Sequence, residues 1–374
     1  MEKFEVIFSE LPDPRDCTAQ HDLTDMLFIA FAATLCGAQS CVEMAEFGLA
    51  KEPLLRQFLR LEHGIPSHDT FSRVFRLLDP EAFAAAFGRF MQAFGEAARI
   101  EAPAGVVALD GKSLKGAYET GRACMPRMMV SAWGAQTRMV LAQTAAPNGN
   151  EVEGALALLK LLRLEGCVVT ADALHCHRTM AGAIREAKAD YALKLKANQP
   201  ALLADAEAAL AAAGERAKRA ESTDQAHGRI ERRTAVVAAA PQLARKHRFP
   251  NLAARGSPDA SGVARIEAWR TLDGRTSHRA YHVLLSKRFS PNKVLAVVRE
   301  HWSIENGLHW PLDVVFQEDL CRTRKDNAPR NLATLRHLSL NVLRANPKKS
   351  SLNLKRRRAG WDDAFLLELL THVR

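Results

Sequence analysis

The stretch VVALDGKS at residues 106–113 decides the fold, because it is an apolar run that ends at an acid, Asp110. A second run, CVVTA at residues 167–171, ends in the same way at Asp172. Short apolar runs bounded by turn residues are typical of buried strands. Strands that alternate with helices pair in parallel, and such sheets bind ligands in the crevice at the carboxyl ends of their strands. We therefore expect both aspartates to lie at strand ends and to face that crevice.

The elements around Asp110 are predicted to form an α/β core. Two apolar segments, 128–133 and 139–144, complete a three-stranded antiparallel meander that has Asp110 on its first strand. A helix, a strand, a helix and a strand are then expected at residues 151–164, 168–172, 179–187 and 191–195. This β-β-β-α-β-α-β order is the outline of a ribonuclease-H-like core with a mixed sheet.

Further segments flank and interrupt this core. Residues 1–100 indicate an all-helical N-terminal domain, with helical patterns at 23–41, 47–61, 69–78 and 80–100 and a link at 101–105. A catalytic domain is expected over 101–345, and it ends with helices at 291–308 and 329–345. A β-rich insertion at about 201–290 contains a helix at 201–213, strands near 230–238, 264–271 and 280–285, and a loop at 255–262. Residues 346–374 are predicted to form a basic C-terminal tail.

The composition favours a polyanionic partner. The chain has 374 residues and a net charge of +10, with 52 Lys and Arg against 42 Asp and Glu. Such an excess favours nucleic acid or an anionic membrane surface. No stretch of about 18 apolar residues is present, so no membrane span is expected, and the first residues lack the apolar core of a signal peptide. Seven cysteines without paired spacing indicate reduced thiols in a cytosolic protein.

Three acids carry the candidate chemistry. Asp110 and Asp172 end strands, and Glu305 lies within HWSIEN at residues 301–306, inside a helical pattern. Two strand-end aspartates and a helical glutamate can converge on a pair of divalent ions, which favour hard oxygen ligands and assist phosphodiester chemistry. A plainer interpretation stays open, since aspartates often follow strands as turn residues and helical glutamates are usually solvated. The alternatives for the third acid are Asp313, Glu318 and Asp319.

Other polar residues near the predicted crevice are candidates for DNA contacts. His309 lies one helical turn after Glu305 and either contacts a phosphate or packs. Basic or amide side chains that hold the DNA backbone, or are simply solvated, are Lys112, Lys115, Lys194, Lys196, Asn198, Arg322, Arg324 and Lys325. Trp302 and Trp310 either stack on unpaired bases or belong to the core. The HCH triplet at residues 175–177 lacks the second ligand pair that a zinc site needs.

Several blocks in one order resemble a known family. They are LPDPR at 11–15, LDGKSLKG at 109–116, GNE at 149–151, VTADAL at 169–174, YALKLKANQ at 191–199, HGRIERR at 227–233 and WSIENGLHW at 302–310. Across nearly its whole length the chain resembles bacterial insertion-sequence transposases of the group that includes the H-repeat-associated proteins, which have a DDE-type catalytic core. It departs from that family at 174–177, where LHCH replaces a more usual MGCQ. The Tyr, Arg, Glu and Lys pattern on the glutamate helix is incomplete, with Arg299 in the place of the Arg and no following Lys.

This resemblance implies a catalytic triad of Asp110, Asp172 and Glu305 that works with Mg²⁺ or Mn²⁺. It also implies double-stranded DNA as the partner, both as element ends and as target, a helical N-terminal domain that binds or positions DNA, and a dimer when DNA is bound. The expected reaction is strand cleavage at the element ends, followed by attack of the freed 3′ hydroxyl on target DNA. The alternatives are a ribonuclease-H-like nuclease that cuts without strand transfer, and an inactive or domesticated DNA-binding protein.

Overall fold

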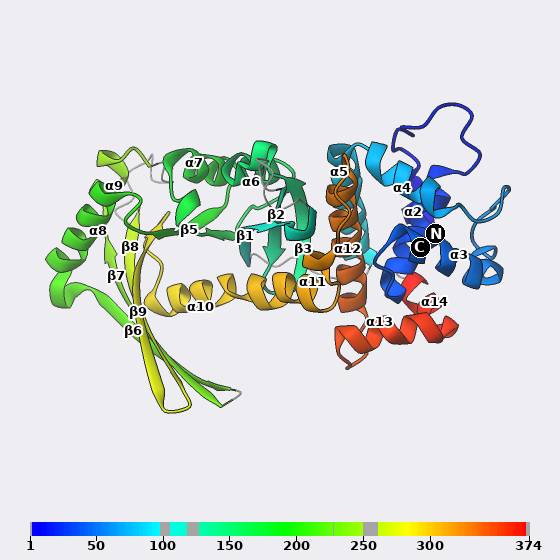
Figure 1. The fold of residues 1–374 in the computed structure, drawn as a ribbon. Helices are drawn as coiled ribbons and strands as arrows, with labels where there is room; N and C mark the ends of the chain where they lie inside the picture. The colour runs from blue at the N-terminus through cyan, green and yellow to red at the C-terminus, as the bar shows by residue number, and fades with distance from the viewer. Residues whose placement is uncertain (1, 98–104, 118–126, 227, 250–260, 372–374) are drawn as a thin grey trace.

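A nine-stranded mixed sheet forms one end of the molecule, and a helical layer forms the other (Figure 1). The computed structural model describes the chain except residues 1, 98–104, 118–126, 227, 250–260 and 372–374. The predicted link at 101–105 and loop at 255–262 therefore lie largely outside the described residues.

The strand order in the sheet is β3-β2-β1-β4-β5-β9-β8-β7-β6. The strands are β1 (Val106–Ser113), β2 (Met128–Gly134), β3 (Met139–Ala145), β4 (Val168–Ala171), β5 (Asp190–Leu195), β6 (Lys218–Ala226), β7 (Arg229–Ala239), β8 (Gly262–Leu272) and β9 (Arg275–Leu285). The predicted antiparallel meander of β1, β2 and β3 is confirmed, as is the parallel pairing of β1 with β4 and of β4 with β5. The strands of the insertion continue the same sheet, because β9 pairs antiparallel with β5.

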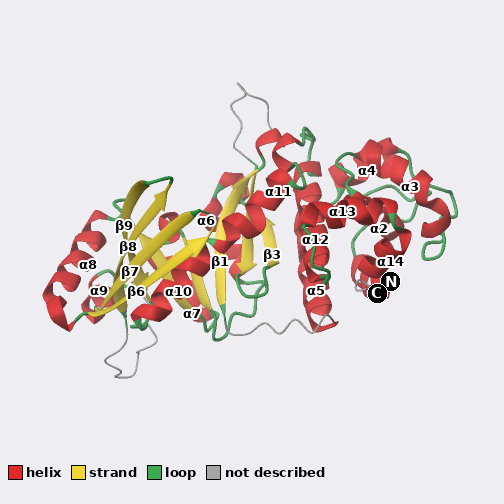
Figure 2. Cartoon of the chain, turned by 90° about the horizontal axis from the view of Figure 1, so that it is seen from below, coloured by secondary structure: helices red, strands yellow, loops and turns green. Residues whose placement is uncertain are grey.

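Helices cover both faces of the sheet, and the alternation of side chains along β1 decides which residues meet them (Figures 1 and 2). On one face lie α6 (Glu151–Leu159), α7 (Arg178–Glu186) and α8 (Pro200–Ala213), and along the other face runs α10 (Pro291–His301). Leu109 is fully buried in the cluster that includes α6 and α7 residues. Successive side chains of a strand point to opposite faces, so Asp110 lies on the face of α10.

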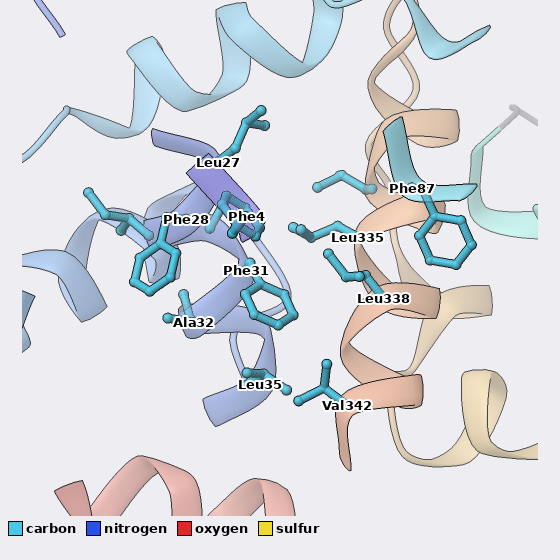
Figure 3. Packing of buried hydrophobic residues seen from close by; sticks show 14 of the residues in the cluster. Phe4, Leu27, Phe28, Phe31, Ala32, Leu35, Phe87, Leu335, Leu338 and Val342 are labelled. Carbon is cyan, nitrogen blue, oxygen red and sulfur yellow. The ribbon is translucent and has the colours of Figure 1, made fainter. Parts of the chain in front are cut away.

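The helical layer combines segments from both ends of the chain. It consists of α1 (Glu2–Phe8), α2 (Leu23–Cys36), α3 (Cys41–Leu55), α4 (His68–Leu77), α5 (Pro80–Ala97), α12 (Ala328–Ala345), α13 (Leu352–Trp361) and α14 (Asp363–Thr371). Phe31 on α2 faces Leu335 and Leu338 on α12 in one buried cluster (Figure 3). That cluster continues into the sheet through Trp133 and Val140. The helices of residues 2–97 therefore share their core with later helices.

The segment predicted as a basic tail is folded, and this corrects the prediction for residues 352–371. Lys355 is buried and donates hydrogen bonds to the carbonyls of Leu343 (3.0 Å) and Asn346 (2.6 Å) at the end of α12. Arg356 is also buried and donates to the carbonyl of Thr34 near the end of α2. Cationic side chains at helix C-termini satisfy carbonyls that have no partner in the helix. The charge run therefore serves packing as well as solvation.

No single helix in the described part of the chain has the length and apolar character needed to cross a membrane. The helices α2 and α3 reach that length and composition only as a pair, and they meet at an angle of 95°.

Replacing Leu338 with alanine is expected to lower the free energy of unfolding by about 2–5 kcal/mol, because it leaves a cavity between α12 and α2. Leu338 is 1% exposed, whereas Leu49 on α3 is 57% exposed and supplies the matched control. Urea unfolding followed by circular dichroism measures both variants. Equal stability losses in Leu338→Ala and Leu49→Ala would contradict the packing described here.

Candidate active site

The two aspartates belong to neighbouring parallel strands, but only Asp172 lies at a strand end. Strand β1 continues past Asp110 and pairs with β2 as far as Ser113, so the prediction that Asp110 ends its strand is wrong. Asp110 lies on β1, and Asp172 directly follows β4, where its Oδ1 accepts a hydrogen bond from the backbone N–H of Leu174 at 2.9 Å. Ala108 pairs with Thr170 in the β1–β4 register, and each aspartate lies two residues beyond that pair. Neighbouring strands are about 4.8 Å apart, and residues two apart share a face. The register therefore places Asp110 and Asp172 side by side on the same face of the sheet, toward the carboxyl ends of β1 and β4.

Glu305 lies in a π-helical turn, Glu305–His309, between α10 and α11 (Trp310–Val314). The sequence predicted one uninterrupted helix over 291–308, and the difference has a local cause. A proline ring clashes with the carbonyl four residues earlier in an α-helix, and Pro311 would meet that of Gly307. The wider turn relieves this clash, and the freed Gly307 carbonyl accepts a hydrogen bond from Arg344. An added Cβ at Gly307 would lie 2.4 Å from the Trp133 ring, so this turn packs directly on β2.

Asp110, Glu305 and His309 form one cluster, in which their potential ligand atoms lie within 4.8 Å of one another. His309 Nδ1 is 3.6 Å from Asp110 Oδ2 and 3.4 Å from Glu305 Oε2. Burial raises the pKa of Asp110 to about 6, and the carboxylates of Glu305 and Glu151 act in the same direction against the influence of His309. The hydrogen bond from His309 holds the pKa of Glu305 below its usual value. Asp172 is not part of this tight cluster.

The two carboxylates fit a divalent ion. Two oxygens that bind one Mg²⁺ at about 2.1 Å can be at most about 4.2 Å apart. The carboxylate oxygens of Asp110 and Glu305 lie within 4.8 Å of each other, so their separation needs to shorten by less than about 1 Å. Carboxylate oxygens suit Mg²⁺ and Mn²⁺. The buried Nε2 of His309 has no hydrogen-bond partner in the described part of the chain, whereas a ligating histidine normally donates its other N–H to an outer partner. His309 is therefore better suited to bridge the carboxylates than to bind the ion.

His301 connects the surroundings of Asp172 and Glu305, and sequence reasoning did not select it. Its Nδ1 lies 3.0 Å from the Thr170 hydroxyl. Burial lowers the pKa of His301 to about 4, and the Lys194 charge adds to this, while Asp172 and Glu305 oppose it. His301 is thus neutral at neutral pH. The Lys194 ammonium lies 5.6 Å from the centre of the Trp302 ring, beside the second aspartate.

Lys112 is not free to contact DNA, and this corrects the prediction. Its side chain is only 10% exposed, and its ammonium lies 2.7 Å from Asp313, 2.9 Å from Asp319 and 3.3 Å from Glu318. The three acids that were alternatives for the third site position therefore neutralise Lys112. Lys115 also binds Asp319, at 2.7 Å, but remains 67% exposed.

The remaining side chains that were predicted to contact DNA differ in their exposure and in the partners they have within the protein. Lys196, Arg322 and Lys325 are exposed. Arg299 is 61% exposed but pairs with Asp224 at 2.7 Å, and Arg324 Nε donates to the Gly116 carbonyl at 3.1 Å. Asn198 donates to the Ala173 carbonyl at 2.9 Å and so holds the turn that follows Asp172. These contacts stay predictions.

The HCH triplet serves local structure. His175 is fully buried and its Nε2 is 2.9 Å from Glu151 Oε1, while His177 caps α7 through the N–H of Met180. Glu151 was not selected from the sequence as a site residue. The GNE block at 149–151 was the signal for it.

A basic, aromatic groove of about 450 Å³ leads to Glu305. Its floor is one face of β7, β8 and β9, since Arg233, Ala268 and Arg279 lie opposite one another in register. The cationic and aromatic side chains on this face are Arg229, Arg233, Arg270, Arg279, Tyr281 and Trp302. The ring of Trp269 instead stacks on His278 on the other face of the sheet. Trp302 and Trp310 are 46% and 56% exposed, so neither is a core residue.

An α/β sheet with one aspartate on its central strand β1 and another just after the neighbouring strand β4, faced by a helical turn with a glutamate, is an arrangement suited to metal-assisted chemistry on phosphodiesters. Residues 101–342 match the family model described as "Transposase DDE domain", and residues 6–91 match the model of the associated domain. The first match covers more than half of the chain, and the protein belongs to the family of transposases with a DDE domain.

Two relatives illustrate the similarity. An uncharacterized protein in the dhlA 3′ region of Xanthobacter autotrophicus is 38% identical over 72% of this chain and 90% of its own length. The H repeat-associated putative transposase YhhI of Escherichia coli (strain K12) is 29% identical over 97% of this chain and 96% of its own length. Among solved structures, the piggyBac transposase synaptic complex with hairpin DNA has 11% identity and a TM-score of 0.43, over 98% of this chain and 77% of that one.

Asp110→Asn is expected to stabilise the metal-free protein at neutral pH. The pKa of Asp110 is about 6 in the folded protein against a usual 3.8, so the folded state binds this proton more tightly. Ionisation of Asp110 therefore lowers the free energy of unfolding. This loss grows as the pH rises from about 4 to about 6 and reaches its full size above that range. Asparagine removes it, and the gain at pH 7.5 is on the order of 1–3 kcal/mol.

Urea unfolding in EDTA at pH 4.5 and pH 7.5 measures this effect. Asp69→Asn, at a side chain that is 83% exposed, is the control and should change little at either pH. The explanation fails if Asp110→Asn stabilises the protein equally at both values.

Proposed function

We propose that this protein is an active DDE transposase that cuts the ends of an insertion sequence and joins the freed 3′ hydroxyl to target DNA. The observation that carries the proposal is the meeting of Asp110 and Glu305, from segments almost 200 residues apart, in a chain of the transposase DDE family. Asp172, which directly follows the neighbouring parallel strand β4, would complete the set. The order of β1 to β5 supports assignment of this part of the sheet to a ribonuclease-H-like core.

The three acids would hold Mg²⁺ or Mn²⁺, which when bound lowers the pKa of a water or hydroxyl nucleophile and stabilises the leaving oxygen. The protein's own part is to position these ligands rigidly. Asp110 is held by the central strand β1, and Glu305 is held by the packing of Gly307 on Trp133. His309 bridges the two carboxylates and would offset part of their repulsion when it is protonated.

Double-stranded DNA is the proposed partner, in the form of element ends and target, and we infer a dimer on paired ends. The groove over β7–β9 supports a path for one DNA strand, because its arginines can neutralise phosphates and its aromatic rings can stack on bases. Arg270 and Arg279 are exposed and form no ion pair with a carboxylate in the described part of the chain, so they are the best candidates for phosphate contacts.

Asp110→Asn, Asp172→Asn and Glu305→Gln are each expected to reduce Mg²⁺-dependent cleavage of element-end DNA by at least about 100-fold, because each removes several kcal/mol of charge stabilisation in the transition state. Gel assays of cleavage and strand transfer measure this loss, and fluorescence anisotropy checks that DNA binding persists. Glu165→Gln, at an acid that is 76% exposed, is the control.

The same assays separate the alternatives. Cleavage without joining of the 3′ end would identify a nuclease. DNA binding by the parent protein without any metal-dependent cleavage would identify an inactive or domesticated DNA-binding protein. Cleavage that survives Glu305→Gln would contradict the assignment of the third acid.

Arg270→Ala and Arg279→Ala are each expected to weaken DNA binding and to reduce the slope of log affinity against log salt concentration by about one, since each removes one phosphate contact. Arg163→Ala, at an exposed residue that follows α6, is the control. Anisotropy titrations at several salt concentrations measure the slope. An unchanged slope in both groove variants would exclude the groove as a DNA path.

A further inference from the structure

A fourth carboxylate, that of Glu151, lies against the backbone next to Asp110. Glu151 is the first residue of α6, and its side chain is 14% exposed. A Cβ built on Gly111 would lie 2.5 Å from Glu151 Cδ and 2.8 Å from Oε2. Any side chain larger than glycine at position 111 would therefore displace this carboxylate. The Glu151 charge also raises the pKa of Asp110.

The two oxygens of Glu151 have different surroundings. Oε1 lies 2.9 Å from Nε2 of His175, which is fully buried. Because an ionised carboxylate only accepts, the imidazole donates in this hydrogen bond. Oε2 has no hydrogen bond within the described residues. One oxygen is thus oriented by a rigid donor, and the other is left available beside Gly111.

This pair connects the two segments that carry the aspartates. Gly111 directly follows Asp110, and His175 ends the 3₁₀ turn that begins after Asp172. Glu151 touches both segments. A glutamate in the first turn of a helix is also favoured by the helix dipole. The helix dipole favours the exposed Glu153 in the same turn just as well. It therefore does not explain why Glu151 has a buried histidine on one oxygen and a glycine against its carboxylate.

We propose that Glu151 is a fourth carboxylate ligand of the catalytic centre, binding through Oε2 the divalent ion that Asp110 binds, and that His175 positions it through Oε1. The inference rests on the proposed function for the presence of the ion. Ligating carboxylates are normally held by outer hydrogen bonds, and loss of such a bond lowers metal affinity by about 10- to 100-fold. His175 is therefore a positioning residue.

Mn²⁺ binding to the full chain, measured by electron paramagnetic resonance titration without DNA, tests the proposal. Glu151→Gln is expected to weaken Mn²⁺ binding by at least about 10-fold and to alter the spectrum of the bound ion. Glu153→Gln, in the same helical turn, is expected to leave both unchanged. Melting curves in EDTA, compared with the parent, show that each variant is folded.

Two further substitutions separate ligation from folding. Gly111→Ala changes no charge but displaces the carboxylate, so it is expected to weaken Mn²⁺ binding in the same direction as Glu151→Gln. His175→Gln keeps a donor near the position of Nε2 and should retain more affinity than His175→Leu. Equal Mn²⁺ affinity in the parent, Glu151→Gln and Gly111→Ala would overturn the proposal.

Failure of this inference and failure of the proposed function give different results. A parent protein that binds Mn²⁺ through Glu151 but never cuts DNA would uphold this inference and refute the transposase activity. A parent that cuts DNA and loses no Mn²⁺ affinity in Glu151→Gln would do the reverse. Failure of the parent to bind Mn²⁺ at all would overturn the Glu151 assignment.

Discussion

The repulsion between carboxylates that are gathered around the partly buried Asp110 is the constraint on which the rest of the structure depends. Asp110 is mostly buried beside Glu305 and Glu151, and its raised pKa expresses the cost of that arrangement. Such a cluster persists only if its scaffold does not yield. Strand β1 is held on both sides, by β2 and β4. The glutamate turn is held by Gly307 against Trp133 and by Arg344.

Every residue from 109 to 112 on β1 meets a different part of this scaffold. Leu109 packs into the core under α6 and α7, and Asp110 faces the site. Gly111 leaves room for Glu151, and Lys112 joins β1 to three acids that follow the glutamate turn. A buried ammonium with three carboxylate partners resists displacement, since removal of one partner leaves uncompensated charge. The strand therefore sets the distance between Asp110 and the segment that carries Glu305.

The sequence was sufficient to place β1 and β4, because the apolar runs before Asp110 and Asp172 are buried. It predicted the end of β4 correctly but ended β1 too early, since pairing with β2 carries that strand through polar residues to Ser113. It was insufficient where contacts between residues far apart in the sequence determine the local structure. The π-helical turn depends on Pro311, Gly307 and Trp133 together. Strand β6 was missed because KRAESTDQA lacks an apolar alternation and lies at the sheet edge, where charged residues are usual. The roles of Lys112 and Arg356 were misjudged because local charge does not reveal buried partners.

The shared core of the helical layer has a consequence for protein synthesis. Helix α2 packs against α12 and α13, and Arg356 joins α13 to the end of α2. Chains emerge from the ribosome with their N-terminal part first. Helix α2 can therefore pack early on α1 and α3, but the side that faces α12 and α13 stays uncovered until more than 300 further residues have been added. A gene copy with a late stop codon would therefore yield a chain with an open helical layer. Such a copy would lose its product to misfolding even though every codon for the acidic cluster is intact.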